Sequence, residues 1–155
     1  MKQAFEILKI GRNNMLNVVK DLTLDQLNVI PQGFNNNLMW NIGHVVVTQQ
    51  LLCYKLSGLP LNIDDKMVTN FAKGSLPSPN FEREDYEQIK KELLRMPDVL
   101  ISDYENGIFK DFNTYPTSFG YDLNSIDDAI LFNNVHEGMH LGYLMALKRA
   151  VLSLS

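Results

Sequence analysis

Residues 125–152 have the sequence SIDDAILFNNVHEGMHLGYLMALKRAVL, and this stretch decides the fold. Ser125 and Asp128 form a Ser-x-x-Asp pattern, which is typical of the first turn of a capped helix. No proline follows before the end of the stretch, so a helix from Ser125 to about Leu152 is expected. Together with three other helical segments in one domain, this helix implies a four-helix bundle.

Three further segments share the helical pattern, with apolar residues recurring every three or four positions. They span residues 2–21, 37–57 and 82–105, and a short turn of helix is expected at 23–30. Gly11 and Arg12 interrupt the apolar face of the first segment, and Pro97 should kink or split the third. No segment has the alternation of a strand. The sequence therefore predicts an all-α protein, a four-helix bundle with long crossing loops, in a single domain covering residues 1–155.

The two long connections differ in composition. Residues 58–81 contain prolines, glycine and serines and are expected to be a crossing loop. Residues 106–124 contain five aromatic side chains, which must be buried against something. This second loop is expected to cap one end of the bundle, and it can also serve as a lid over a pocket or as part of a dimer surface. Its aromatic residues are Phe109, Phe112, Tyr115, Phe119 and Tyr121.

Charge and composition exclude several classes of protein. The net charge of −4 and the absence of any long basic cluster argue against binding to nucleic acid. A single cysteine, Cys53, excludes an internal disulfide framework and suits a reducing compartment. No stretch approaches the roughly 20 apolar residues that span a bilayer. A cytoplasmic protein without a membrane partner is therefore expected.

The chain has only three histidines, and their positions indicate a metal site. His136 and His140 are four residues apart in one predicted helix, so both side chains leave the same face about one turn apart. His44 lies in the middle of the second predicted helix, on a side that a bundle would bury. One divalent ion held by all three imidazoles accounts for this pattern. Alternatively, each histidine is satisfied separately by a backbone carbonyl or a polar neighbour. Cys53 faces the opposite side of its helix from His44 and is expected to be a packed thiol.

Residues 136–140 also match H-E-x-x-H, the signature of zinc metalloproteases in which the glutamate is the general base. The rest of the chain argues against that activity. No histidine or glutamate follows His140 as a third ligand, and no strand is expected that a peptide substrate could pair with.

Two motifs together resemble those of the DinB/YfiT-like proteins, the DinB superfamily. Residues Trp40–His44, WNIGH, resemble the W-x-I/L-x-H element of the family's second helix, and residues 136–142, HEGMHLG, resemble its C-terminal H-E-x-x-H-x-G element. The resemblance covers nearly the whole chain. It implies a four-helix bundle that holds a divalent metal, often nickel or zinc, at the positions of His44, His136 and His140.

The resemblance also bears on function. Some relatives are transferases or isomerases that use low-molecular-weight thiols, and many have no assigned activity. The family name implies no binding to DNA. The resemblance suggests a homodimer. The position after Gly142 is often glutamine in relatives and is Tyr143 here, which either donates its hydroxyl group or packs.

Three neutral imidazoles leave at least one position of a metal ion open, which is typical of catalytic sites. The expected function is transfer of a low-molecular-weight thiol to a small electrophile. Metal-dependent hydrolysis is an alternative, and so is a metal-stabilised binding or dimerisation module without activity. Glu137 is the candidate catalytic residue, as a base or as an orienting carboxylate; otherwise it is a solvated or capping residue. An enzyme predicts a pocket at the ion, lined by loop aromatics such as Phe112, Tyr115 or Phe119. The non-enzymatic module predicts a closed site without a cavity.

Overall fold

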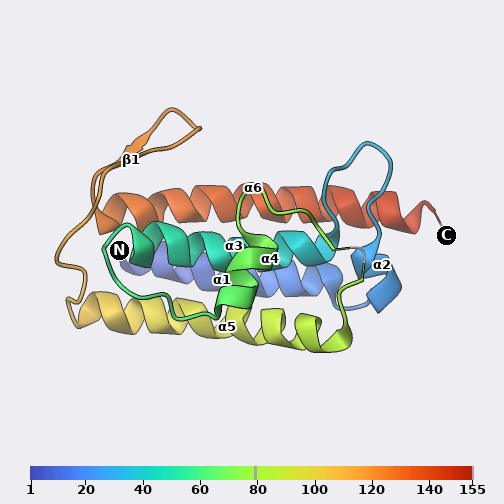
Figure 1. Ribbon diagram of the computed structural model, residues 1–155, viewed down its shortest axis with the longest axis horizontal. Helices are drawn as coiled ribbons and strands as arrows, with labels where there is room; N and C mark the ends of the chain where they lie inside the picture. The colour runs from blue at the N-terminus through green and yellow to red at the C-terminus, as the bar shows by residue number, and fades with distance from the viewer. Residues whose placement is uncertain (79, 155) are drawn as a thin grey trace.

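Four long helices lie side by side in a computed structural model that describes residues 1–78 and 80–154 (Figure 1). The bundle consists of α1 (Lys2–Val19), α3 (Leu38–Gln50), α5 (Arg83–Glu105) and α6 (Ile126–Leu152). A short helix, α2 (Leu24–Asn28), follows α1. The predicted all-α four-helix bundle is confirmed, and the predicted helix boundaries are close to the observed ones.

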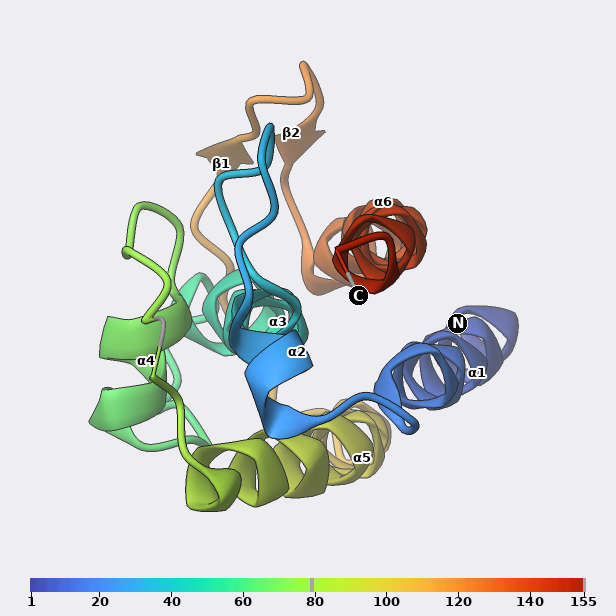
Figure 2. The same cartoon turned by 90° about the vertical axis from the view of Figure 1, so that its right-hand side faces the viewer.

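The helices form a four-cornered arrangement, which Figure 2 shows end-on. Both α1 and α3 pack against α5 and α6, so the pairs α1/α3 and α5/α6 lie across the diagonals. The chain runs in one direction along α1 and α6 and in the other along α3 and α5 (Figure 1). The connection from α3 to α5 must therefore return along the whole bundle, whereas the connection from α5 to α6 stays at one end.

Side-chain caps fix the starts of the helices that contain the histidines. The side chain of Asn37 accepts a hydrogen bond from the backbone N–H of Trp40 at the start of α3. Ser125 accepts one from Asp128 at the start of α6, as the Ser-x-x-Asp pattern predicts. The predicted second helix continues beyond α3 as a π-helical segment, η1 (Leu51–Lys55). Such wider turns are frequent at functional sites.

The returning connection, predicted to be a loop, contains a seven-residue helix, α4 (Asp65–Phe71). Asp64 caps it by accepting a hydrogen bond from the N–H of Met67. Met67 and Phe71, one turn apart, bury their side chains against the bundle. Because only one short apolar face docks, the segment lacks the extended periodicity from which the longer helices are predicted.

The aromatic connection forms a small hairpin, which corrects the expectation of a strandless chain. Two short antiparallel strands, β1 (Tyr115–Pro116) and β2 (Asp122–Leu123), pair across a turn that ends at Gly120. Gly120 has a φ of +83°, a conformation that favours glycine. Strands of two residues are too short to produce an alternating pattern. As predicted, the segment caps one end of the bundle, where Phe109 packs against Tyr54.

Pro97 lies inside α5 without splitting it, and Arg12 replaces the hydrogen bond that the proline removes. A proline at position 97 has no N–H to donate to the carbonyl of Leu93, four residues earlier. Arg12 Nη1 donates to that carbonyl instead, at 3.2 Å. Although Arg12 interrupts the apolar pattern of α1, its side chain is fully buried, and it satisfies the acceptor that the proline leaves free.

The apolar core is formed by side chains from all four long helices. Within the described ranges, no helix is both long and apolar enough to cross a membrane.

Candidate metal centre

The three histidines come together between two facing helices. His44 projects from α3, and His136 and His140 project from α6, which packs directly against it. Each histidine offers one ring nitrogen to a metal ion, and these three nitrogens all lie within 4.8 Å of one another. The bundle thus brings His44 next to two histidines that follow it by about ninety residues in the sequence, as the metal-site hypothesis requires.

The ring of His44 is held on three sides. Its Nδ1 lies 2.7 Å from the carbonyl oxygen of Phe71 and must donate, which leaves the lone pair on Nε2. Trp40 stacks on the ring, with centroids 4.4 Å apart. The hydroxyl group of Thr48, one turn further along α3, lies 3.2 Å from Nε2 and donates to it. A metal ion bound at Nε2 would replace this hydrogen bond, because Nε2 has one lone pair.

Gly43 allows α4 to approach closely enough for this contact. A Cβ atom at position 43 would lie 2.6 Å from ring carbons of Phe71, closer than real contacts allow. The aromatic ring therefore occupies the space that a side chain would fill, and the carbonyl group of the same residue reaches His44. Helix α4, which the sequence pattern does not predict, thus supports the site.

His140 is oriented by a side chain from the opposite helix. Its Nδ1 lies 2.8 Å from Oδ1 of Asn41, so Nδ1–H donates and Nε2 keeps its lone pair. Asn41 is itself fixed, because its Nδ2 donates to the carbonyl of Asn37 at 2.8 Å. Hydrogen bonds of this kind set the tautomer and direction of metal-binding imidazoles.

His136 provides the test of whether a cation fits. Its Nδ1 is buried and has no hydrogen-bond partner among the described residues. A buried polar atom without a partner is costly, and a cation bound through this nitrogen would remove that cost. Together with the two oriented neighbours, His44 and His140, this ring completes a set of neutral nitrogen donors that fits a divalent ion.

All three imidazoles are held in the neutral form that metal binding needs. Burial, together with the proximity of His140 and His44, lowers the pKa of His136 to about 3. Burial and the proximity of His44 lower the pKa of His140 to about 4. Burial also lowers the pKa of His44, against the opposing effect of its hydrogen bond to Phe71. Protons therefore compete weakly for these nitrogens.

Glu137, the predicted catalytic residue, is buried in an ion pair. Arg12 donates to its two carboxylate oxygens at 2.7 and 3.0 Å, and Asn133 donates to one of them at 2.7 Å. The alternative of a solvated or capping carboxylate is wrong, because Glu137 is 3% exposed. Arg12 also donates to Gln49, so it links α1 to all three of the other long helices. Periodicity alone gave no sign of this network.

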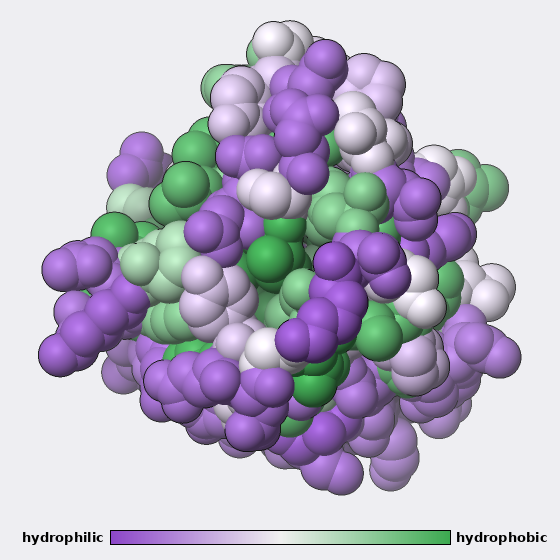
Figure 3. Space-filling view, turned by 90° about the vertical axis from the view of Figure 1, so that its left-hand side faces the viewer, coloured by the Kyte–Doolittle hydropathy of each residue, from purple (hydrophilic) through white to green (hydrophobic). Residues whose placement is uncertain are grey.

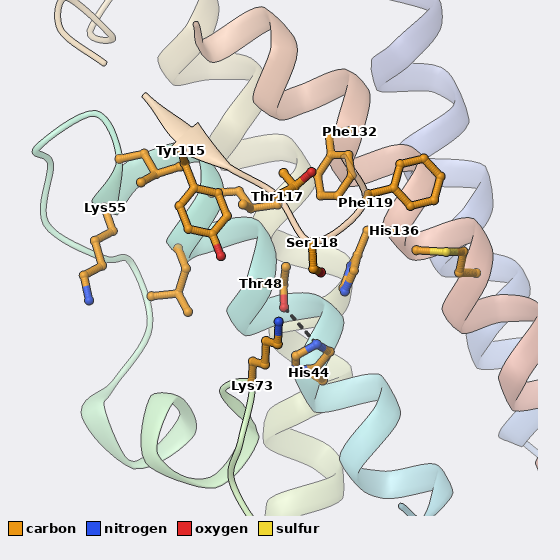
Figure 4. A pocket seen from close by; sticks show the side chains of 14 residues that line it. His44, Thr48, Lys55, Lys73, Tyr115, Thr117, Ser118, Phe119, Phe132 and His136 are labelled. Atoms are coloured by element: carbon orange, nitrogen blue, oxygen red, sulfur yellow. Dashed lines mark hydrogen bonds between the residues drawn. The ribbon is translucent and has the colours of Figure 1, made fainter. Parts of the chain in front are cut away.

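A cavity of about 370 Å³ opens beside two of the histidines, His44 and His136 (Figure 4). Its apolar wall is formed by η1, the hairpin and α6, through Leu51, Leu52, Leu56, Tyr115, Phe119, Phe132 and Met139. Its polar residues are Thr48, Lys55, Lys73, Thr117 and Ser118. Figure 3 shows the end of the bundle that carries the hairpin, where apolar surface is surrounded by hydrophilic residues.

The structure also places the aromatic residues, the tyrosine and the cysteine for which the sequence left a role open. Tyr115 and Phe119 line the cavity as predicted, whereas Phe112 is half-buried elsewhere in the cap. Tyr143 packs edge-to-face on Phe34, with centroids 5.5 Å apart, in agreement with the packing alternative. Cys53 is fully buried, and burial raises the pKa of its thiol to about 12, as expected for a packed side chain.

The protein is thus a four-helix bundle with a cluster of three histidines beside a cavity. The two facing helices supply the histidines, and the cluster can hold a metal ion. The family model of the DinB superfamily matches residues 7–144, and the chain belongs to this superfamily. The match includes both histidine motifs, the whole of α3 and α5, and most of α1 and α6. Comparison with curated proteins finds no match.

Proposed function

We propose that this protein is a metal-dependent enzyme that transfers a low-molecular-weight thiol to a small electrophile. The observation that supports the proposal is the position of the cavity, since two of the three clustered histidines, His44 and His136, form part of its wall. A site that served only to tie helices together would have no need of such a space. The cavity also argues against a purely structural metal site.

The proposed ion is divalent nickel or zinc, which imidazole ligands suit. Held by His44, His136 and His140, it would supply the positive charge that lowers the pKa of a thiol. In the overall reaction the thiol loses its proton to solvent, a carbon–sulfur bond forms, and the leaving group departs with the electron pair of its broken bond.

The chain's own residues would position the reactants. Tyr115, Phe119 and Phe132 provide apolar walls that exclude water from the electrophile, and edge-to-face packing of the two phenylalanines holds the hairpin against α6. Thr48 provides a hydroxyl group next to His44. We assign Glu137 the role of an orienting carboxylate and not that of a base, because its ion pair with Arg12 fixes the helix turn that contains His136.

The experiment compares metal-loaded wild-type protein with His136→Ala in two assays. One follows conjugation of 2-mercaptoethanol to an aryl halide, and the other follows hydrolysis of a nitrophenyl ester. Conjugation that needs both nickel or zinc and His136 is the expected result. Met145→Ala, a change at an exposed position of α6, is the matched control and should retain activity. Ester hydrolysis without conjugation would favour the hydrolase, and inactivity in both assays would contradict the proposal.

A further inference from the structure

The cavity beside the histidines is positively charged. Two lysines, Lys55 and Lys73, line it, and no aspartate or glutamate is found among the described residues of its wall. The protein as a whole has a net charge of −4, so this local excess of positive charge is opposite to the average. A divalent ion on three neutral imidazoles would add to it, since none of those ligands offsets its charge.

Lys73 is the lysine that faces the histidines. It extends from the segment after α4, and its amino group lies near His44 and Thr48 (Figure 4). The charge of Lys73 is close enough to contribute to the lowered pKa of His44. Lys55 lies at the outer side of the cavity, with its amino group directed away from the histidines.

Neither cavity lysine is neutralised by a carboxylate in the part of the chain that the structure describes. Other lysines of the same protein do have such partners: Lys9 pairs with Asp98 at 2.7 Å, and Lys66 pairs with Asp85 at 2.9 Å. An ammonium group without a carboxylate partner at the edge of an apolar cavity is suited to an anionic ligand, because positive charge that lines a cleft attracts anions.

We propose that the thiol substrate carries a carboxylate group and that Lys73 binds it. This inference rests on the proposed function and specifies its substrate class. Lys73 lines the same cavity as His44 and His136, so a short thiol with its sulfur at the histidines would direct a carboxylate toward Lys73, while the aromatic end of the cavity stays free for the electrophile. The wall has no arginine among its described residues, so a single ammonium group near the histidines supplies the charge that one carboxylate needs.

Binding of two probes of the same size tests the proposal. Nickel-loaded protein is titrated calorimetrically with 3-mercaptopropionate and with its neutral amide, 3-mercaptopropionamide. The wild type should bind the carboxylate about tenfold more tightly than the amide, as one charge-assisted contact predicts. Lys73→Gln should reduce this preference to the part that the ion contributes, and it should leave binding of the amide unchanged. Lys91→Gln, on the exposed side of α5, is the matched control and should keep the preference.

Lys73→Arg should restore the preference, which separates loss of charge from loss of folding. The proposal is overturned if Lys73→Gln keeps the wild-type ratio of affinities, or if the wild type does not discriminate between the probes. No electrophile is present in the titration, so the result does not depend on turnover. A carboxylate preference together with failed conjugation would support the anion site and contradict only the proposed function.

Discussion

Oδ1 of Asn41 on α3 accepts a hydrogen bond from Nδ1–H of His140 on α6, at 2.8 Å. The two residues are 99 positions apart in the sequence, and the contact crosses the interface between the helices that supply the metal-site donors. Asn41 thus determines which nitrogen of His140 has a free lone pair. Asn41 precedes His44 by three residues on the same helix. Helix α3 therefore contributes one metal-binding nitrogen, from His44, and orients another, that of His140.

Replacement of Asn41 by leucine should therefore weaken metal binding. Loss of an orienting contact of this kind typically lowers metal affinity about 10- to 100-fold. Asn41→Asp keeps an acceptor at the same position and should retain most of the affinity. Competition with a chromophoric chelator measures both values. Equal affinities for the leucine variant and the wild type would show that His140 needs no such support.

Position 43 should tolerate alanine poorly, because the ring of Phe71 occupies the space in which a Cβ atom would lie. Gly43→Ala is expected to reduce the free energy of unfolding by about 1–3 kcal/mol through overpacking. It should also weaken metal binding, because displacement of Phe71 removes the acceptor for Nδ1 of His44.

Gly11→Ala is the matched control. Gly11 is also helical, and an added Cβ would meet nothing within 4 Å. This change should stabilise the protein by about 0.5–1 kcal/mol, since alanine favours a helix over glycine. Urea denaturation of the two variants measures the difference. Similar stabilities for both would contradict a steric requirement at position 43.

The sequence was sufficient to predict the four long helices and the pairing of His136 with His140, because both depend on spacing within one helix. The place of His44 beside that pair depends on the packing of α3 against α6, and it was predicted from the position of His44 on a buried side of its helix and from the family motifs. His136 and His140 share a face by helical geometry alone. The contribution of Asn41 was not predictable, because it depends on the register between α3 and α6, which no local pattern encodes. Arg12 was misleading for a related reason. A charged residue in an apolar stripe normally indicates an exposed break, yet here Glu137, 125 residues away, neutralises it inside the core.

The buried pair of Arg12 and Glu137 should be sensitive to removal of either partner. Glu137→Leu leaves the guanidinium of Arg12 buried without its counter-charge, at a cost of about 3–5 kcal/mol in the free energy of unfolding. The double variant Arg12→Met, Glu137→Leu should recover much of that loss. The exposed pair of Lys9 and Asp98 is the control, and Lys9→Ala should cost less than about 1 kcal/mol. Urea denaturation checks all three variants, and an equal cost for the buried and exposed pairs would contradict this role.

Each of the three histidines should contribute to metal content. Alanine at position 44, 136 or 140 is expected to lower the stoichiometry of bound nickel or zinc, measured by elemental analysis of protein purified without a histidine tag. His136→Ala and His140→Ala should have similar effects, because both side chains leave one face of α6. Chelation should lower the melting temperature of the wild type but not of the triple variant. Full metal content in the triple variant would disprove the site.

The metal-free protein should lose stability as the pH falls below neutral. In the folded state the pKa values of His136 and His140 are lowered to about 3 and about 4, whereas the unfolded chain has the ordinary value of 6.5. Between these values the unfolded state binds more protons, so acid favours unfolding. The stabilisation is fully present above pH 6.5 and is lost progressively toward pH 4. Each imidazole should account for roughly 2 kcal/mol between pH 7 and pH 5. Urea denaturation in the presence of a chelator measures this dependence, and the double variant His136→Ala, His140→Ala should show a clearly shallower one. An equally steep dependence in that variant would assign the effect to other groups.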